Sequence, residues 1–208
     1  GATPGAMARH TDDPRWIVFD CRHDLADTAL GRRAYAQSHI LGARFLHLDD
    51  DLSGVKTGTN GRHPLPDPEM FRARLAALGM ANDKQAIAYD ASGGYFAARL
   101  WWMLRWVGHR RVAVLDAGWE AWLKAGLAVS DQLPLPKPAT FDAVMRDDAV
   151  DLRFILARHG RADLCLIDAR SPDRFRGENE TLDPVGGHIP GAINRFFKHN
   201  LEPDGHFK

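Results

Sequence analysis

Apolar positions follow two patterns along the first two thirds of the chain. Short apolar runs, partly β-branched, predict buried strands, and longer stretches with apolar residues every three or four positions predict helices. The predicted strands are residues 17–20, 44–48, 85–89 and 112–115. The predicted helices are residues 30–37, 67–78, 94–107 and 119–125. Strands that alternate with helices indicate an α/β domain whose mostly parallel sheet is covered on both faces.

The helix predicted over residues 67–78 has sequence signals for both its start and its end. Its apolar residues recur at i, i+4 and i+7, beginning at Phe71. Asp67 suits the N-cap, Pro68 suits the first turn, and Gly79 suits the position after the helix.

A proline-rich segment divides the chain. Prolines at alternate positions between 134 and 138 block both helix and central strand and favour an extended spacer. Beyond it, the pattern predicts a helix, a strand and the start of a helix at residues 151–157, 164–168 and 173–176. The predicted organisation is a domain, a linker and a second domain, at residues 8–130, 131–150 and 151–208. Residues 1–6, which precede Met7, are expected to lie outside the fold.

Bulk composition narrows the class of protein. The chain has 208 residues, 45% hydrophobic and 26% charged, which is ordinary for a globular protein. Its net charge is zero, so nothing indicates a nucleic-acid or membrane partner. Cys21 and Cys165 are predicted to be buried structural thiols, and so few cysteines without a secretory signal favour a cytoplasmic protein. The ten histidines show no convincing ligand spacing, so neither a metal nor a cofactor is predicted.

The chain repeats itself. An Asp-x-Arg sequence at residues 20–22 returns at 168–170, and a His-Ile-x-Gly-Ala sequence at 39–43 returns at 188–192. The offset is nearly constant at about 150 residues, a common domain size. A repeat of this length predicts two copies of one domain, the second of them incomplete within these residues.

The first copy contains one candidate for a ligand-binding loop. The strand at 85–89 leads into Asp90, then Gly93 and Gly94, and then a helix. Ligands in parallel α/β sheets bind at the carboxyl ends of strands, beside helix N-termini. The glycine-containing loop can wrap its N–H groups around an anion or a thiolate, and a simple tight turn is the alternative.

Together, the repeated sequences, the loop at Asp90 and the Asp-Ala-Gly-Trp-Glu-Ala-Trp sequence at 116–122 resemble the two-domain rhodanese family of sulfurtransferases. The resemblance covers nearly everything after Arg15, with Leu41 departing from the proline usual in the family sequence. It implies tandem rhodanese-like domains of the α/β class, each a mostly parallel sheet with helices on both faces.

In that family, a cysteine at the start of a six-residue loop in the second domain takes up sulfane sulfur as a persulfide. Asp90 stands at the nucleophile position of the first copy, which implies a catalytically silent domain. His39 and Asp90 are 51 positions apart, so the matching residue, counted from His188, falls near position 239. The nucleophilic cysteine is therefore expected after Lys208, and the chain is expected to be a fragment.

The resemblance also implies which side chains bind the donor. Arg174 matches a position that binds the anionic donor, and Arg176 is expected to flank the pocket. An ion pair with a neighbouring acid, for instance Asp173 or Glu178, is the structural alternative for Arg174. Asp168 and Arg170 are expected to form a structural ion pair near the site.

The implied reaction transfers sulfur from thiosulfate to cyanide or a thiol. A thiol protein such as a thioredoxin is a further acceptor of this kind. One alternative donor is 3-mercaptopyruvate. Family members that prefer it often carry a second arginine after the Arg174 motif, and residues 178–185 contain none, which favours thiosulfate. A non-catalytic binding or regulatory module is the alternative from another class, and a phosphatase on this fold ranks last because the first-copy loop lacks Cys and Arg.

Overall fold

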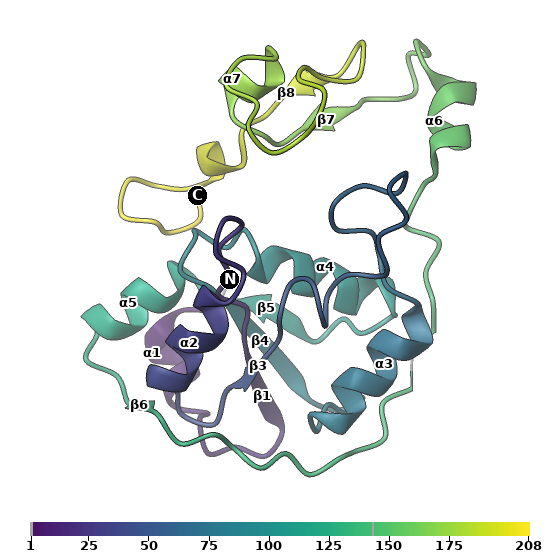
Figure 1. Cartoon of the computed structure of the whole chain (residues 1–208). Coiled ribbons are helices and arrows are strands. Elements are labelled where there is room, and N and C mark those ends of the chain that lie inside the picture. The colour runs from purple at the N-terminus through teal and green to yellow at the C-terminus, as the bar shows by residue number, and fades with distance from the viewer. Residues whose placement is uncertain (1, 143) are drawn as a thin grey trace. The chain divides into compact units, whose positions relative to one another are not determined.

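A computed structural model describes residues 2–142 and 144–208 (Figure 1). These residues form two compact units, Gly1–Arg146 and Asp147–Lys208. The predicted opening segment and the predicted linker each include one residue, Gly1 and Ala143, that lies outside the described residues.

A parallel sheet of four strands forms the centre of the first unit. Its strand order is β3-β1-β4-β5, and each neighbouring pair is parallel. The strands are β1 (Trp16–Asp20), β3 (Arg44–Phe45), β4 (Gln85–Tyr89) and β5 (Val112–Val114). The strand predicted at 44–48 is shorter than expected, because the chain leaves the ladder after Phe45. The α/β class predicted from the sequence is thus observed.

Helices cover both faces of this sheet, as the pattern predicted. The helices are α1 (Pro4–Ala8), α2 (Leu30–Gln37), α3 (Pro68–Ala77), α4 (Ala97–Trp106) and α5 (Gly118–Lys124). Figure 1 shows α3 and α4 on one side of the strands and α1, α2 and α5 on the other. Alternate residues of β1 divide between two apolar clusters, with Phe19 packed in one and Val18 in the other. The strands read as continuous apolar runs because both faces are buried.

The expectation that residues 1–6 lie outside the fold is wrong for the part that the structure describes. Pro4–Ala8 is a helix, and Met7 is 1% exposed within the core. The backbone N–H of Ala2 donates to the carbonyl of Val114 at 3.0 Å, so the opening segment lies along the edge of the sheet. A short apolar segment with a free edge strand beside it gains burial and hydrogen bonds together.

The predicted linker begins by packing on the first unit. A short antiparallel pair, β2 (His39–Ile40) with β6 (Val129–Ser130), leads into the proline-rich segment. Further on, Phe141 is 1% exposed, and its carbonyl accepts a hydrogen bond from Arg72 at 2.8 Å. The extended segment is therefore anchored before the second unit begins.

The second unit is small and open. It contains α6 (Leu152–Arg158), β7 (Ile167–Asp168), α7 (Pro172–Phe175), β8 (Ile193–Asn194) and a 3₁₀ turn η1 (Phe197–Asn200). β7 and β8 are parallel. None of its described residues falls in the buried class.

The cysteine prediction holds for one residue only. Cys21 is buried, and burial raises the pKa of its thiol well above the ordinary value. Cys165 is exposed, because β7 is shorter than the strand predicted at 164–168 and leaves this residue outside the ladder. Among the described residues, no helix has the length and apolar character that a bilayer span requires.

Candidate functional site

The loop after β4 holds an anion, and that anion is its own side chain. One carboxylate oxygen of Asp90 accepts the backbone N–H groups of Ser92 (2.8 Å) and Gly94 (2.9 Å). The other oxygen accepts those of Phe96 (2.7 Å) and Ala97 (2.8 Å) at the start of α4. Asp90 is 1% exposed, so the four hydrogen bonds are shielded from water.

This cradle depends on the two glycines. Gly93 and Gly94 have φ values of 69° and 83°, in the left-handed region that a side chain disfavours. Their conformation turns successive N–H groups toward one point, as an anion-binding loop requires. The loop is therefore more than the tight turn that the sequence left open, and its donors are already used by a carboxylate.

The Asp-x-Arg sequence of the first unit folds into a buried ion pair. Two guanidinium nitrogens of Arg22 donate to the carboxylate of Asp20, the shorter contact being 2.6 Å. The same guanidinium donates to the carbonyl of Ser38 and lies 4.3 Å from the ring centre of Trp119. Tyr89 donates its hydroxyl to Asp20 at 2.6 Å. The pair thus fixes the ends of β1 and β4 relative to the start of β2.

The second unit repeats this arrangement. Arg170 donates to the carboxylate of Asp168, with a shortest contact of 2.6 Å, and also to the carbonyl of Gly187. Gly187 precedes His188 just as Ser38 precedes the first-copy histidine. The hydrogen bond from Arg170 is the main cause that lowers the pKa of Asp168. The two copies of the sequence therefore form the same local structure.

The repeated histidines are hydrogen-bonding residues: His39 begins β2, and His188 lies in the loop before β8. The Nδ1 atom of His39 lies 2.8 Å from the carbonyl oxygen of Tyr35, and that of His188 lies 2.6 Å from the carbonyl oxygen of Phe175. Each imidazole also stacks on the aromatic ring of the residue whose carbonyl it contacts. The two histidines therefore make the same contacts in both copies.

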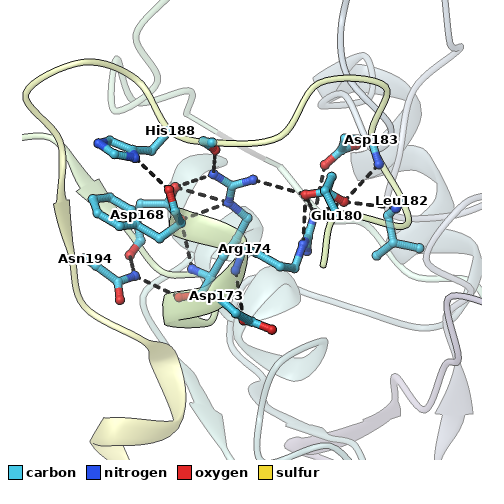
Figure 2. A network of polar contacts seen from close by, with 11 residues as sticks. Asp168, Asp173, Arg174, Glu180, Leu182, Asp183, His188 and Asn194 are labelled. Carbon is cyan, nitrogen blue, oxygen red and sulfur yellow. Dashed lines mark hydrogen bonds and ion pairs between the residues drawn. The ribbon is translucent and has the colours of Figure 1, made fainter. Parts of the chain in front are cut away.

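Arg174 is held by carboxylates (Figure 2). Its guanidinium donates to Glu180 at 2.9–3.0 Å and to Asp183 at 3.0 Å. The same Glu180 carboxylate accepts the N–H groups of Leu182 and Asp183. The hydrogen bond from Leu182, followed by that from Arg174, lowers the pKa of Glu180 to about 2 against a burial effect that would raise it. The structural alternative, an ion pair, is thus realised with different acids from the expected Asp173 or Glu178.

Arg176 lies apart from this network. It forms an exposed ion pair with Glu178, with contacts of 2.8 and 3.1 Å. A cavity of about 540 Å³ in the second unit is lined by Asp168, Arg170, Asp183 and residues 185–189. The structure therefore places Asp168 and Arg170 at a cavity and does not bring Arg174 or Arg176 to its described lining.

A second cavity, on the first unit, was missed by the sequence reasoning. Its lining includes His23, His47, Asp49 and His63. Spacing along the chain gave no signal, because the residues come from the ends of two strands and from a long loop. The available signal was a set of polar residues at the ends of two predicted strands: His23 follows residues 17–20, and His47 and Asp49 lie at the end of residues 44–48.

The fold and these strand ends define an α/β protein with an anion-holding loop at the carboxyl edge of a parallel sheet. Comparison with known families identifies its class. The model of the rhodanese-like domain matches residues 3–125. The chain belongs to the rhodanese-like family.

Relatives of the chain are named as sulfurtransferases. A probable 3-mercaptopyruvate sulfurtransferase of Pseudomonas aeruginosa is 44% identical over 99% of this chain and 73% of its own length. A putative thiosulfate sulfurtransferase, SseB of Mycobacterium tuberculosis, is 36% identical over 91% of this chain and 67% of its own length. The crystal structure of SseA from Escherichia coli, described as a 3-mercaptopyruvate sulfotransferase with the rhodanese fold, aligns with a TM-score of 0.84 and 31% identity. That alignment covers 99% of this chain and 78% of SseA.

Proposed function

We propose that this chain is part of a sulfurtransferase that takes sulfur from 3-mercaptopyruvate and passes it to a thiophilic acceptor through a cysteine persulfide. The observation that carries the proposal is the 44% identity, over 99% of the chain, to a protein named as a probable 3-mercaptopyruvate sulfurtransferase. The donor differs from the thiosulfate that the sequence favoured.

In the proposed reaction, a cysteine thiolate attacks the sulfur of 3-mercaptopyruvate. The carbon–sulfur bond breaks, its electron pair passes to carbon, and protonation there gives pyruvate. The persulfide then transfers its outer sulfur to cyanide or a thiol and regenerates the thiolate. Such a thiolate needs N–H donors and a helix N-terminus to hold its charge.

The nucleophile is proposed to lie in a second rhodanese-like domain, beyond Lys208. Support comes from the repeated Asp-x-Arg structure and from the chemistry of the residues at hand. Asp90 fills the cradle of the first unit with a carboxylate, which forms no transferable persulfide. Cys21 is buried with a raised pKa, and Cys165 lies before a strand, away from any strand–loop–helix junction among the described residues.

Thiosulfate is the second candidate donor, and one observation favours it. Residues 178–185 contain no arginine, and Arg174 is engaged by Glu180 and Asp183. A donor carboxylate would thus find no second guanidinium in this segment. The relative named as a putative thiosulfate sulfurtransferase supports the same donor.

The test compares both donors on the protein encoded by the full reading frame, with cyanide as acceptor. We expect a higher kcat/KM with 3-mercaptopyruvate, and an intact mass that gains one sulfur atom with the donor and loses it to cyanide. A serine variant of the cysteine near position 239 is the control and should gain no sulfur. A higher kcat/KM with thiosulfate would identify thiosulfate, and not 3-mercaptopyruvate, as the preferred donor. Sulfur uptake by the serine variant would show that this cysteine is not the nucleophile.

A further inference from the structure

The cavity on the first unit collects ligand-type side chains that the proposed sulfur chemistry does not use. It has a volume of about 420 Å³. It lies beyond the carboxyl ends of β1 and β3, which lead to His23 and His47, and residues of the long loop that carries His63 also line it. Its charged lining residues are Asp49, Asp50, Lys56 and Arg62.

His23 is the unusual member of this group. Its side chain is 1% exposed, and neither ring nitrogen has a hydrogen-bond partner among the described residues. A buried polar group without a partner destabilises a fold by about 1–3 kcal/mol, so it requires an explanation. Edge contacts with the rings of His47 and Phe96 fix its orientation.

His47 is oriented in the manner of a metal ligand. Its Nε2 lies 2.8 Å from the carbonyl oxygen of Thr28, which only accepts, so Nε2 carries the proton. The lone pair is therefore on Nδ1, where it accepts the backbone N–H groups of Asp49 and Asp50 at 3.2 Å, and a metal bound there would replace these two hydrogen bonds. Metal-bound histidines commonly donate their other N–H to a backbone carbonyl in this way.

Asp49 supplies the charge. Its carboxylate lies 3.8 Å from Nε2 of His23 and 3.5 Å from Nε2 of His63. Ligand atoms of His23, His47 and Asp49 all lie within 4.8 Å of one another. In a tetrahedral zinc site with bonds of about 2.0–2.1 Å, ligand atoms are about 3.3 Å apart. The widest separation must contract by about 1.5 Å, which breaks no hydrogen bond at the His23 ring but displaces the Asp49 and Asp50 N–H groups from Nδ1 of His47.

We propose that His23, His47 and Asp49 bind a divalent transition metal of the zinc type, with His63 beside the fourth position. Two imidazoles and a carboxylate suit zinc. Asp49 and Asp50 balance Lys56 and Arg62 in the lining, so the cavity has no net positive charge that would favour a simple anion. Lys56, whose side chain is 55% exposed and lies 3.1 Å from Asp49, is free to swing into water when the metal takes over that carboxylate.

The experiment titrates the purified 208-residue chain, stripped with EDTA and dialysed, with Co²⁺ and then Zn²⁺. We expect one Co²⁺ per chain, with visible absorption bands of four-coordinate geometry that stoichiometric Zn²⁺ abolishes. Each of His23→Gln and Asp49→Asn should weaken Zn²⁺ binding at least about tenfold. His159→Gln, an exposed histidine of the second unit, is the matched control and should bind as the parent chain does.

Binding strength and folding are measured on the same samples, with the melting temperature of every variant taken in EDTA. Asp49→Asn decides the outcome should His23→Gln fail to fold, because the side chain of Asp49 is partly exposed. The absence of saturable binding by the parent chain would overturn the site. Parent-like affinity in a folded Asp49→Asn variant, or loss of binding in His159→Gln, would overturn it equally. Sulfur transfer enters none of these readouts, so the proposed function stands or falls separately.

Discussion

At the scale of single residues, Asp90 makes four hydrogen bonds that its amide analogue cannot reproduce. Asparagine offers one acceptor oxygen, and its NH₂ group would face two of the N–H donors at the start of α4. Each buried donor left unsatisfied destabilises by about 1–3 kcal/mol, so Asp90→Asn should lower the free energy of unfolding by about 2–4 kcal/mol. Urea unfolding followed by tryptophan fluorescence measures this, with exposed Asp12→Asn as control. An equal free energy of unfolding for the parent chain and Asp90→Asn would show that the four hydrogen bonds of Asp90 do not stabilise the fold.

The two Asp-x-Arg pairs of the first unit offer a matched comparison of burial. Arg15 makes three hydrogen bonds to Asp13, and Arg22 makes the same three to Asp20 and one more from Nε, yet the Arg15 side chain is 76% exposed and that of Arg22 only 7%. Arg22→Gln leaves the buried carboxylate of Asp20 with hydrogen bonds but without its cationic partner, so we expect a loss of about 3–5 kcal/mol in unfolding free energy. Arg15→Gln should change it far less, because water screens an exposed pair. Similar losses in the two variants would show that the buried pair has no special role.

At the scale of elements, the turn that follows α7 is held by carboxylate hydrogen bonds. The pKa of Glu180 in the folded protein is about 2, below its ordinary value of 4.5. Ionised Glu180 therefore contributes its full stabilisation to the fold above pH 4.5, and this contribution is lost as the pH falls toward 2. Arg174→Gln should raise the Glu180 midpoint but leave it below 4.5, because the Leu182 N–H remains. Carboxyl NMR titration measures this. Arg176→Gln, which loses the Glu178 pair instead, should leave the Glu180 midpoint unchanged.

Elements with local signals were predicted well from the sequence. The helix at 30–37 and the strand at 85–89 have the predicted bounds, and Asp67 caps α3 by accepting the N–H of Met70. The β2–β6 pair was missed because it joins distant residues and lacks a pattern of its own. The cluster around His23 was missed for the same reason, since the topology of the sheet creates it. Arg174 was predicted to bind the donor because of the family resemblance. The resemblance did not predict its ion pairs with Glu180 and Asp183.

At the scale of the molecule, the two units differ in how much they bury, and their stabilities should differ accordingly. In the first unit, the sheet lies between two apolar clusters, whereas no described residue beyond Arg146 is buried. Amides open most readily where few buried contacts hold them. We therefore expect the amides of β1 and β4 to exchange orders of magnitude more slowly than those of Ile193 and Arg195, which donate to the carbonyls of Leu166 and Asp168.

The same hydrogen-exchange experiment locates the end of the first unit. The predicted linker is bonded to this unit as far as Arg146, whose N–H donates to the carbonyl of Trp106 at 2.9 Å, and the amide of Ala139 donates to Ala76. Protection should therefore extend through residue 146 and stop there, well beyond residue 130, where the pattern ended the first domain. Phe141→Ala should remove protection from this segment alone, because Phe141 is its buried anchor. Fast exchange at Ala139 and Arg146 in the parent chain would instead show a free linker.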